Sequence, residues 1–234
     1  MPLNGSTSDS DSPLFYPIGL NLTGKRIFIA GAGNVAARKL ARLVSHECVI
    51  QVVSPACSAA FLAILREHDE LERVKVHTVS YDKSQLEAFQ PHLVFACTND
   101  PAVNSQIVKD ANAREIWVNV ATDGARQSDF ILPSLLEYDA LMVAIFSSGA
   151  SPLFSRKLRE SIEQQVGPWA RPYLQVVQTL RQEIQAQVSD EAERRSCYEA
   201  LLNDPELLSA CQTERPDIPT ILSATRNRLP LSRV

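Results

Sequence analysis

A short apolar stretch, residues 26–30, leads directly into the turn Gly31-Ala32-Gly33-Asn34-Val35-Ala36 and then into a segment whose apolar residues recur at helical spacing. A strand, a glycine turn and a helix N-terminus in this order form a cradle for a phosphate, because the glycines allow close backbone approach and the first helical amides face the anion. The G-x-G-x-x-A pattern in this context predicts a dinucleotide site formed by Gly31, Gly33, Asn34 and Val35. The alternative is a tight turn without a ligand.

Strand-like and helix-like segments alternate after this turn. Apolar runs predict further strands at 48–53, 74–79, 93–97 and 117–120, and helical spacing predicts helices at 59–66 and 101–113. Such alternation is typical of βαβ units and of a parallel sheet. The predicted fold class is therefore α/β, with a Rossmann-like parallel sheet that binds its ligand at the carboxyl ends of the strands.

Polar residues gather at that carboxyl edge of the predicted sheet. Because Ser54 follows the second strand and Thr98-Asn99 follows the fourth, we expect Ser54, Thr98 and Asn99 to complete a site for NAD. The second strand ends without the Asp or Glu that often holds the ribose hydroxyls, and without an Arg for a 2′-phosphate. The residues therefore leave the choice between NAD and NADP open.

The pattern changes after residue 124. Two apolar runs, 129–134 and 141–146, have no helix between them and predict a pair of strands joined by the link 135–140. An apolar pair this short is poorly stable alone, and pairing across a two-fold axis would cover it. We therefore expect a homodimer, with an ordinary hairpin as the alternative.

The last part of the chain is helical in character. Ser151 and Pro152 predict a helix start, further helices are expected at 169–187, 190–202 and 205–212, and residues 213–234 show no strong pattern. The predicted organisation is a disordered tail (1–12), an NAD-binding Rossmann domain (13–124), a small β dimerisation segment (125–149) and a C-terminal helical domain (150–234).

Charge and cysteine usage exclude several classes of partner. The formal net charge of −4 gives no basic field for nucleic acid, and no apolar run is long enough for a membrane span. The N-terminus has no apolar signal core, and the five cysteines show no CxxC pair. We therefore expect a cytoplasmic protein with neither metal ligands nor a disulfide framework.

Several motifs occur in the order, and nearly at the spacing, of one known family: Leu14-Phe15-Tyr16-Pro17, the glycine turn, Cys97-Thr98-Asn99-Asp100, Asn119-Val120-Ala121-Thr122-Asp123, Phe130-Ile131-Leu132-Pro133-Ser134 and Ser147-Ser148-Gly149-Ala150-Ser151-Pro152. On these motifs the chain resembles the precorrin-2 dehydrogenase / sirohydrochlorin ferrochelatase family, which also forms the N-terminal half of siroheme synthase. The resemblance covers residues 13–165. It implies NAD-dependent oxidation of precorrin-2, a tetrapyrrole, to sirohydrochlorin, and in some members insertion of ferrous iron.

The resemblance also implies where the chemistry takes place. Asp123 matches the family's catalytic aspartate, and a carboxylate after the fifth strand can take a proton from the macrocycle. One extra residue between Asn119 and Phe130, compared with some members, leaves Asp129 as the lesser candidate. Small residues leave room for a flat ligand, and cations suit its carboxylates. The expected substrate-binding residues are Asn119, Ser147, Ser148, Gly149 and Arg156.

Two other functions stay open at this point. An NAD-sensing regulatory module would bind the dinucleotide without chemistry, but such modules usually keep an acid where this chain has Ser54. An oxidoreductase of a small metabolite would be expected to carry a catalytic His or Lys near a strand end. It would also leave the helical third of the chain without a role.

Overall fold

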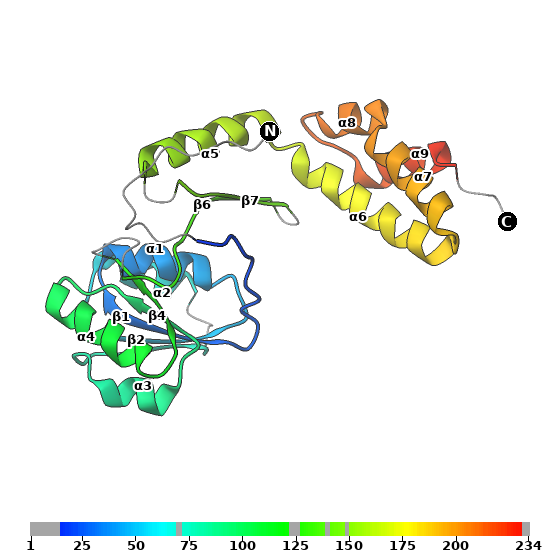
Figure 1. Cartoon of the computed structure of the whole chain (residues 1–234). Helices are drawn as coiled ribbons and strands as arrows, with labels where there is room; N and C mark the ends of the chain where they lie inside the picture. Colours follow the sequence, from blue (N-terminus) through cyan, green and yellow to red (C-terminus); the bar gives the residue numbers. More distant parts are fainter. Residues whose placement is uncertain (1–14, 69–71, 122–126, 139–140, 148–149, 231–234) are drawn as a thin grey trace, which may run out of the picture. The chain divides into compact units, whose positions relative to one another are not determined.

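The computed structural model describes residues 15–68, 72–121, 127–138, 141–147 and 150–230 (Figure 1). The chain divides into two compact units after Leu132. The predicted fold class is confirmed, because the first unit holds a parallel sheet with helices and the second holds a small antiparallel sheet followed by helices.

The first unit is built on five parallel strands in the order β3-β2-β1-β4-β5. Side chains of the central strand alternate between two cores: Ile27 and Ile29 share one with α1 and α2, whereas Phe28 shares the other with α3 and α4. The elements are β1 (Arg26–Ala32), α1 (Asn34–Leu43), β2 (Val49–Cys57), α2 (Ala59–Glu67), β3 (Val74–His77), α3 (Lys83–Phe89), β4 (Leu93–Ala96), α4 (Pro101–Asn112) and β5 (Trp117–Val120).

Strand β2 continues further than the sequence predicts. It runs to Cys57, because β1 itself continues through Gly31 to Ala32 and pairs there with Cys57 after a register shift. Residues 54–57 therefore border the carboxyl edge of the sheet as extended chain.

Helix α3 is absent from the sequence prediction. It has only 7 residues, and Leu86 is the one residue in it that is buried. A capping box starts it, in which Asp82 Oδ1 accepts a hydrogen bond from the Ser84 amide at 2.9 Å and Gln85 Oε1 accepts one from the Asp82 amide at 3.0 Å. So short a helix with one buried position leaves no periodic apolar pattern to recognise.

The second unit begins with an antiparallel pair, β6 (Ser134–Tyr138) and β7 (Leu141–Ile145), against which α5 (Pro152–Val166) packs. The prediction of a strand at 129–134 is wrong. Residues 128–130 belong to the first unit, where the Asp129 amide donates to the Val118 carbonyl and the Phe130 ring packs on Phe95.

The remaining helices of the second unit form a core of their own. The predicted start of α5 is confirmed, since Ser151 Oγ accepts a hydrogen bond from the Phe154 amide at 3.1 Å. The sequence pattern does not predict helix α9, although Ile221 within it and Leu229 directly after it are buried in this core. The further helices are α6 (Ala170–Gln187), α7 (Glu191–Leu202), α8 (Pro205–Cys211) and α9 (Ile218–Arg228).

Candidate functional site: a dinucleotide cleft

The turn between β1 and α1 requires a glycine at position 31. Gly31 has a φ of +99°, a backbone conformation that side chains other than glycine rarely adopt. A Cβ atom at this position would lie 2.5 Å from the carbonyl oxygen of Cys97. Gly31 therefore lets the turn lie directly against the chain that leaves β4.

Gly33 has a different task, because it starts helix α1. It is the N-cap residue, no side chain of the described residues caps the helix there, and its first turn carries no acidic side chain. The neighbouring helices α2 and α4 are capped by Ser58 and Asp100. A Cβ atom at Gly33 would meet nothing within 4 Å. The open N-terminus of α1, which carries Asn34 and Val35, is therefore suited to an anion.

A cleft of about 560 Å³ opens at this turn. Five of the seven predicted cofactor-binding residues line it, and the other two, Asn34 and Val35, lie in the first turn of α1. The structure thus brings the predicted site together at the carboxyl ends of β1, β2 and β4. The residues that line the cleft are Gly31, Ala32, Gly33, Val53, Ser54, Pro55, Ala56, Cys57, Ser58, Ser80, Tyr81, Cys97, Thr98, Asn99, Asp100 and Val103.

Two hydroxyl groups in the cleft are fixed by the protein itself. Ser54 Oγ donates to the carbonyl of Ala56 at 2.6 Å, so it faces a ligand only as an acceptor. The Thr98 hydroxyl donates to Asn104 Oδ1 at 2.8 Å. The same Asn104 side chain also holds the Thr98 backbone, since its Oδ1 accepts from the Thr98 amide at 3.1 Å and its Nδ2 donates to the Thr98 carbonyl at 3.0 Å. The sequence prediction missed Asn104, which is buried in α4 and shapes the loop after β4.

The cleft is nearly without charge. Among the described residues that line it, only Asp100 carries a charge, and its carboxylate accepts a hydrogen bond from the Ala102 amide at 2.8 Å at the start of α4. The end of β2 offers neither an acid nor a cation. A glycine-lined cleft beside an open helix N-terminus fits a dinucleotide whose pyrophosphate lies at that helix.

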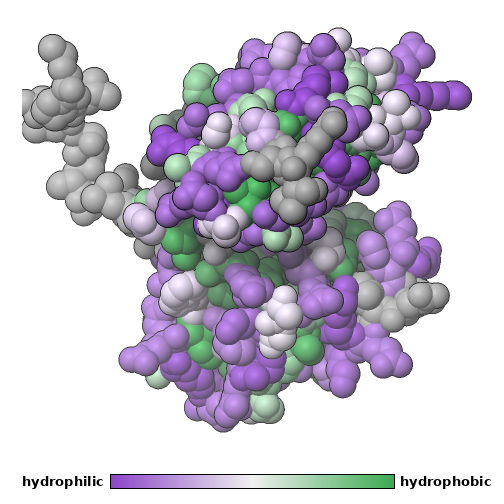
Figure 2. Space-filling view, turned by 90° about the vertical axis from the view of Figure 1, so that its right-hand side faces the viewer, coloured by the Kyte–Doolittle hydropathy of each residue, from purple (hydrophilic) through white to green (hydrophobic). Residues whose placement is uncertain are grey.

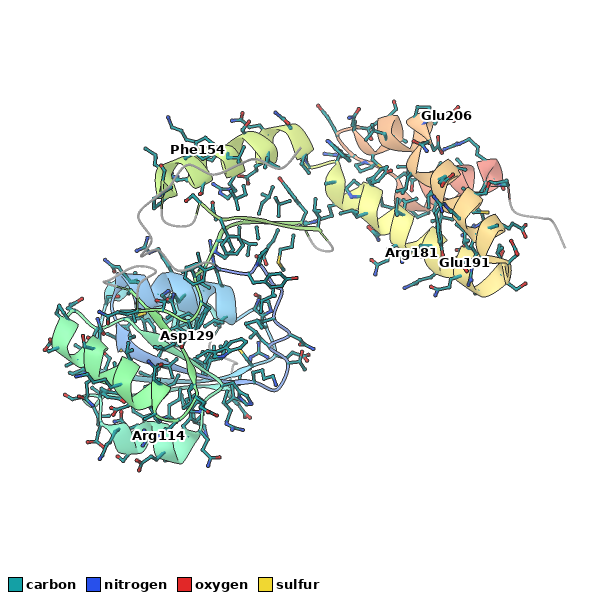
Figure 3. The ribbon with its side chains drawn as sticks, viewed as in Figure 1. Arg114, Asp129, Phe154, Arg181, Glu191 and Glu206 are labelled. Carbon is teal, nitrogen blue, oxygen red and sulfur yellow. The ribbon has the colours of Figure 1, made fainter. Side chains whose placement is uncertain are left out.

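The residues expected to act in catalysis lie around β5. Asp123 lies outside the described residues. Asp129, which is labelled in Figure 3, accepts a hydrogen bond through Oδ2 from the Val118 amide at 2.8 Å. Ser128 Oγ accepts one from the Val120 amide at 2.9 Å. The carboxylate of Asp129 thus satisfies the free edge of β5, which gives it a structural task.

The residues predicted to bind substrate are spread along the chain, on β5, between β7 and α5, and on α5 itself. Asn119 is buried in β5, where its amide bonds to Lys39 and to the Phe130 carbonyl. Ser147 Oγ accepts from the Ser151 amide at 3.4 Å, and the exposed Arg156 pairs with Glu160 at 2.8 Å. Ser148 and Gly149 lie outside the described residues. The substrate-binding role of this set stays a prediction.

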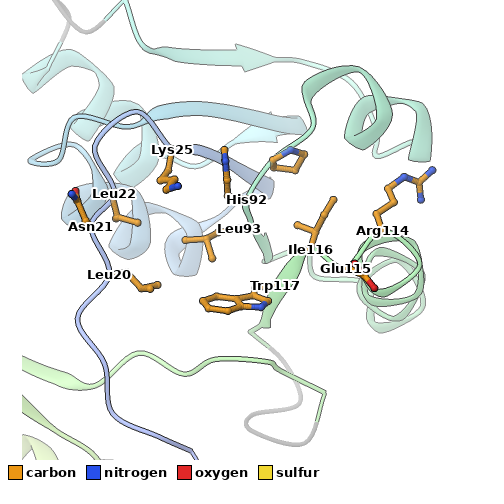
Figure 4. Close-up of a pocket in the computed structure, with 11 residues that line it drawn as sticks. Leu20, Asn21, Leu22, Lys25, His92, Leu93, Arg114, Glu115, Ile116 and Trp117 are labelled. Carbon is orange, nitrogen blue, oxygen red and sulfur yellow. The ribbon is translucent and has the colours of Figure 1, made fainter.

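A second pocket, of about 450 Å³, lies at the amino ends of the strands, away from the dinucleotide cleft at their carboxyl ends (Figure 4). It collects Leu20, His92 and Trp117 near the amino ends of β4 and β5, and none of the predicted site residues lines it. In the part of the chain that the structure describes, no three His, Cys, Asp or Glu side chains come together as a metal site. No helix there is long and apolar enough to cross a membrane.

Comparison with known proteins finds relatives for most of the chain. The family profile described as "Putative NAD(P)-binding" matches residues 18–134. A siroheme synthase of Chromobacterium violaceum is 34% identical over 191 residues, which are 82% of this chain and 39% of that protein. A siroheme synthase of Tolumonas auensis is 29% identical over 203 residues, which are 87% of this chain and 42% of that protein.

The chain thus spans about two fifths of the length of these curated relatives. Among solved structures, "SirC, precorrin-2 dehydrogenase" matches with a TM-score of 0.68 and 22% identity, over 91% of this chain and 100% of that chain. This match concerns the fold. Together these findings confirm the resemblance that the motifs indicate.

Proposed function

The chain belongs to this NAD(P)-binding family, and from that premise we propose that it is an NAD-dependent dehydrogenase that oxidises precorrin-2 to sirohydrochlorin. One observation carries the proposal: a glycine turn and an uncapped helix N-terminus open into a nearly uncharged cleft in a chain whose relatives are siroheme synthases. NAD is preferred over NADP, because no cation lies among the described lining residues to balance a 2′-phosphate.

Different residues of the chain bind the cofactor and remove the proton from the substrate. Gly31 and Gly33 allow the pyrophosphate to approach the backbone, and the amides at the start of α1 bind it. NAD⁺, when bound, supplies the hydride acceptor. The carboxylate of Asp123 takes the proton that leaves the macrocycle with the hydride, as a general base that follows β5 in the sequence. The five cysteines are free thiols, which suits a reducing cytoplasm.

The visible spectrum of precorrin-2 tests this function directly. We expect conversion to sirohydrochlorin when the protein and NAD⁺ are both present, slower conversion with NADP⁺, and none when either protein or nucleotide is omitted. A protein that binds NAD⁺ but leaves the spectrum unchanged would instead favour the regulatory module. Iron insertion into the product, measured by adding Fe²⁺ in a second step, tests the further activity that some members of the resembling family have.

We also propose that the chain is a homodimer through β6 and β7. Leu136 is buried, whereas Met142 lies on the other face of this strand pair, opposite Glu137, and is 59% exposed. Leu153 and Phe154 of α5 are more than half exposed as well. Figure 2 shows hydrophobic patches among a mostly hydrophilic surface. Apolar surface left open on a short strand pair is typical of an interface.

Light scattering distinguishes the dimer from an ordinary hairpin. We expect twice the monomer mass of 25.9 kDa at micromolar concentration. Met142→Lys would place a charge in the interface and shift the protein to the monomer, whereas the control Met142→Leu would remain dimeric. A monomer in the unmodified protein would contradict the proposed dimer.

A further inference from the structure

The adenosine end of the cleft lacks the group that usually recognises it. In dinucleotide folds of this kind an acid at the end of the second strand holds the ribose hydroxyls. Here that position is Ser54, whose hydroxyl donates a hydrogen bond to the Ala56 carbonyl at 2.6 Å. Ser54 therefore offers the ribose one neutral acceptor oxygen where a carboxylate would offer two charged ones, which leaves a role for a second contact to the adenosine half of the cofactor.

Tyr81 lies at this end of the cleft. It follows β3, and the last residue of that strand, His77, is paired with Val53 of β2, directly before Ser54. Tyr81 lines the cleft together with Val53, Ser80 and Val103, and it is the one aromatic side chain among the described lining residues. An aromatic ring thus borders the part of the cleft that Val53 and Ser54 of β2 also line.

The protein holds this ring through two contacts. The Tyr81 hydroxyl donates to Asp110 Oδ2 at 2.9 Å, and the other oxygen of that buried carboxylate accepts from Gln106 Nε2 at 3.0 Å. The ring of Phe28 on β1 packs against the Tyr81 ring in a T-shaped arrangement, with ring centroids 6.2 Å apart, and is the second contact that holds it. Burial, together with the hydrogen bond to Asp110, raises the pKa of Tyr81, so the hydroxyl remains a neutral donor at physiological pH.

We infer that Tyr81 is the specificity-determining residue for the adenine base, which packs on its ring in place of recognition through a ribose acid. The inference rests on the proposed function, because it takes the ligand of the cleft to be a dinucleotide. A ring anchored at its hydroxyl and packed against Phe28 offers a pre-organised surface, so little conformational entropy is lost when a base packs on it. Aromatic packing of a base contributes enough affinity to replace the missing carboxylate.

Calorimetric binding of three nucleotides separates the two halves of the cofactor. Tyr81→Leu should weaken NAD⁺ and ADP about ten- to one-hundred-fold, the range expected for the loss of one base–aromatic contact, and leave nicotinamide mononucleotide unchanged. Tyr81→Phe keeps the ring and should lose much less affinity. The matched control is Phe89→Leu, because the Phe89 ring also packs near Phe28, at 6.4 Å, but does not line the cleft.

Two results would overturn the inference: equal NAD⁺ affinity in Tyr81→Leu and the unmodified protein, or equal weakening of all three nucleotides. Failure of the unmodified protein to bind NAD⁺ would instead contradict the proposed function. A second measurement does not depend on how well the variant folds. In the unmodified protein, saturation of the ring protons of Tyr81 should transfer to the adenine protons of bound ADP. Absence of that transfer would contradict the inference.

Discussion

The ammonium group of Lys39 on α1 lies 2.6 Å from the amide oxygen of Asn119 on β5, 80 residues later in the sequence. The nitrogen of the same amide donates to the Phe130 carbonyl at 2.8 Å. Lys39 Nζ also lies 4.9 Å from the centroid of the Phe95 ring, and burial lowers the pKa of the lysine. One buried amide therefore joins α1, β5 and the segment that returns along β5.

Asn119→Leu should destabilise the protein by about 2–4 kcal/mol, because it leaves both the Lys39 ammonium and the Phe130 carbonyl without this partner in a buried place. Urea denaturation measures the loss. The control Asn112→Leu, at an exposed helix end, should change little. If Asn119 serves substrate binding instead, Asn119→Leu will keep its stability and show only a raised KM.

The two glycines of the turn predict opposite outcomes. Gly31→Ala combines a φ of +99° with a Cβ atom 2.5 Å from the Cys97 carbonyl, and it should cost about 3 kcal/mol or more of stability. Gly33→Asp meets open space, and an aspartate is a good N-cap. It should fold as well as the unmodified protein but lose NAD⁺ binding, because its carboxylate would occupy the place of the pyrophosphate.

Thermal melting and calorimetry with NAD⁺ check this pair of variants. If Gly33→Asp binds NAD⁺ as tightly as the unmodified protein, the phosphate cradle is assigned to the wrong turn. If Gly31→Ala melts at the unmodified temperature, the close approach between the turn and the Cys97 carbonyl is wrong.

Stability should fall in alkaline solution through Cys97. Burial raises the pKa of this thiol from 9.0 to about 11, against the opposing charge of Lys39. Because the folded pKa is the higher one, the folded state holds its proton more tightly. The contribution to stability is fully present below pH 9 and is lost as pH rises toward 11.

Cys97→Ala should show a flatter dependence of unfolding free energy on pH, by about 2 kcal/mol between these limits. Denaturant titrations at several pH values measure the difference. Parallel profiles for the two proteins would show that the thiol is not buried as described.

The sequence predicts the elements whose apolar pattern repeats over several residues, such as β1 and α1. It does not predict α3 or α9, where few positions are buried. The apolar run at 129–134 has the composition of a strand, yet Phe130 is used to pack on Phe95, 5.4 Å away. Site residues such as Asn104 and Tyr81 are recognisable only after folding, because their partners lie elsewhere in the chain.

The final prediction separates the two candidate bases. Asp129 already accepts a hydrogen bond from the Val118 amide at 2.8 Å, so Asp129→Asn, which keeps an acceptor oxygen, should retain most dehydrogenase activity. Asp123→Asn should lower the rate of precorrin-2 oxidation about a hundred- to ten-thousand-fold, as expected for loss of a general base, while NAD⁺ affinity is kept. Initial rates of precorrin-2 oxidation and calorimetric NAD⁺ affinities, measured on both variants, test this prediction. Full oxidation by Asp123→Asn would mean that the proton leaves to another group, and loss in Asp129→Asn would point to Asp129. Iron insertion measured on the same variants would show whether one carboxylate serves both reactions.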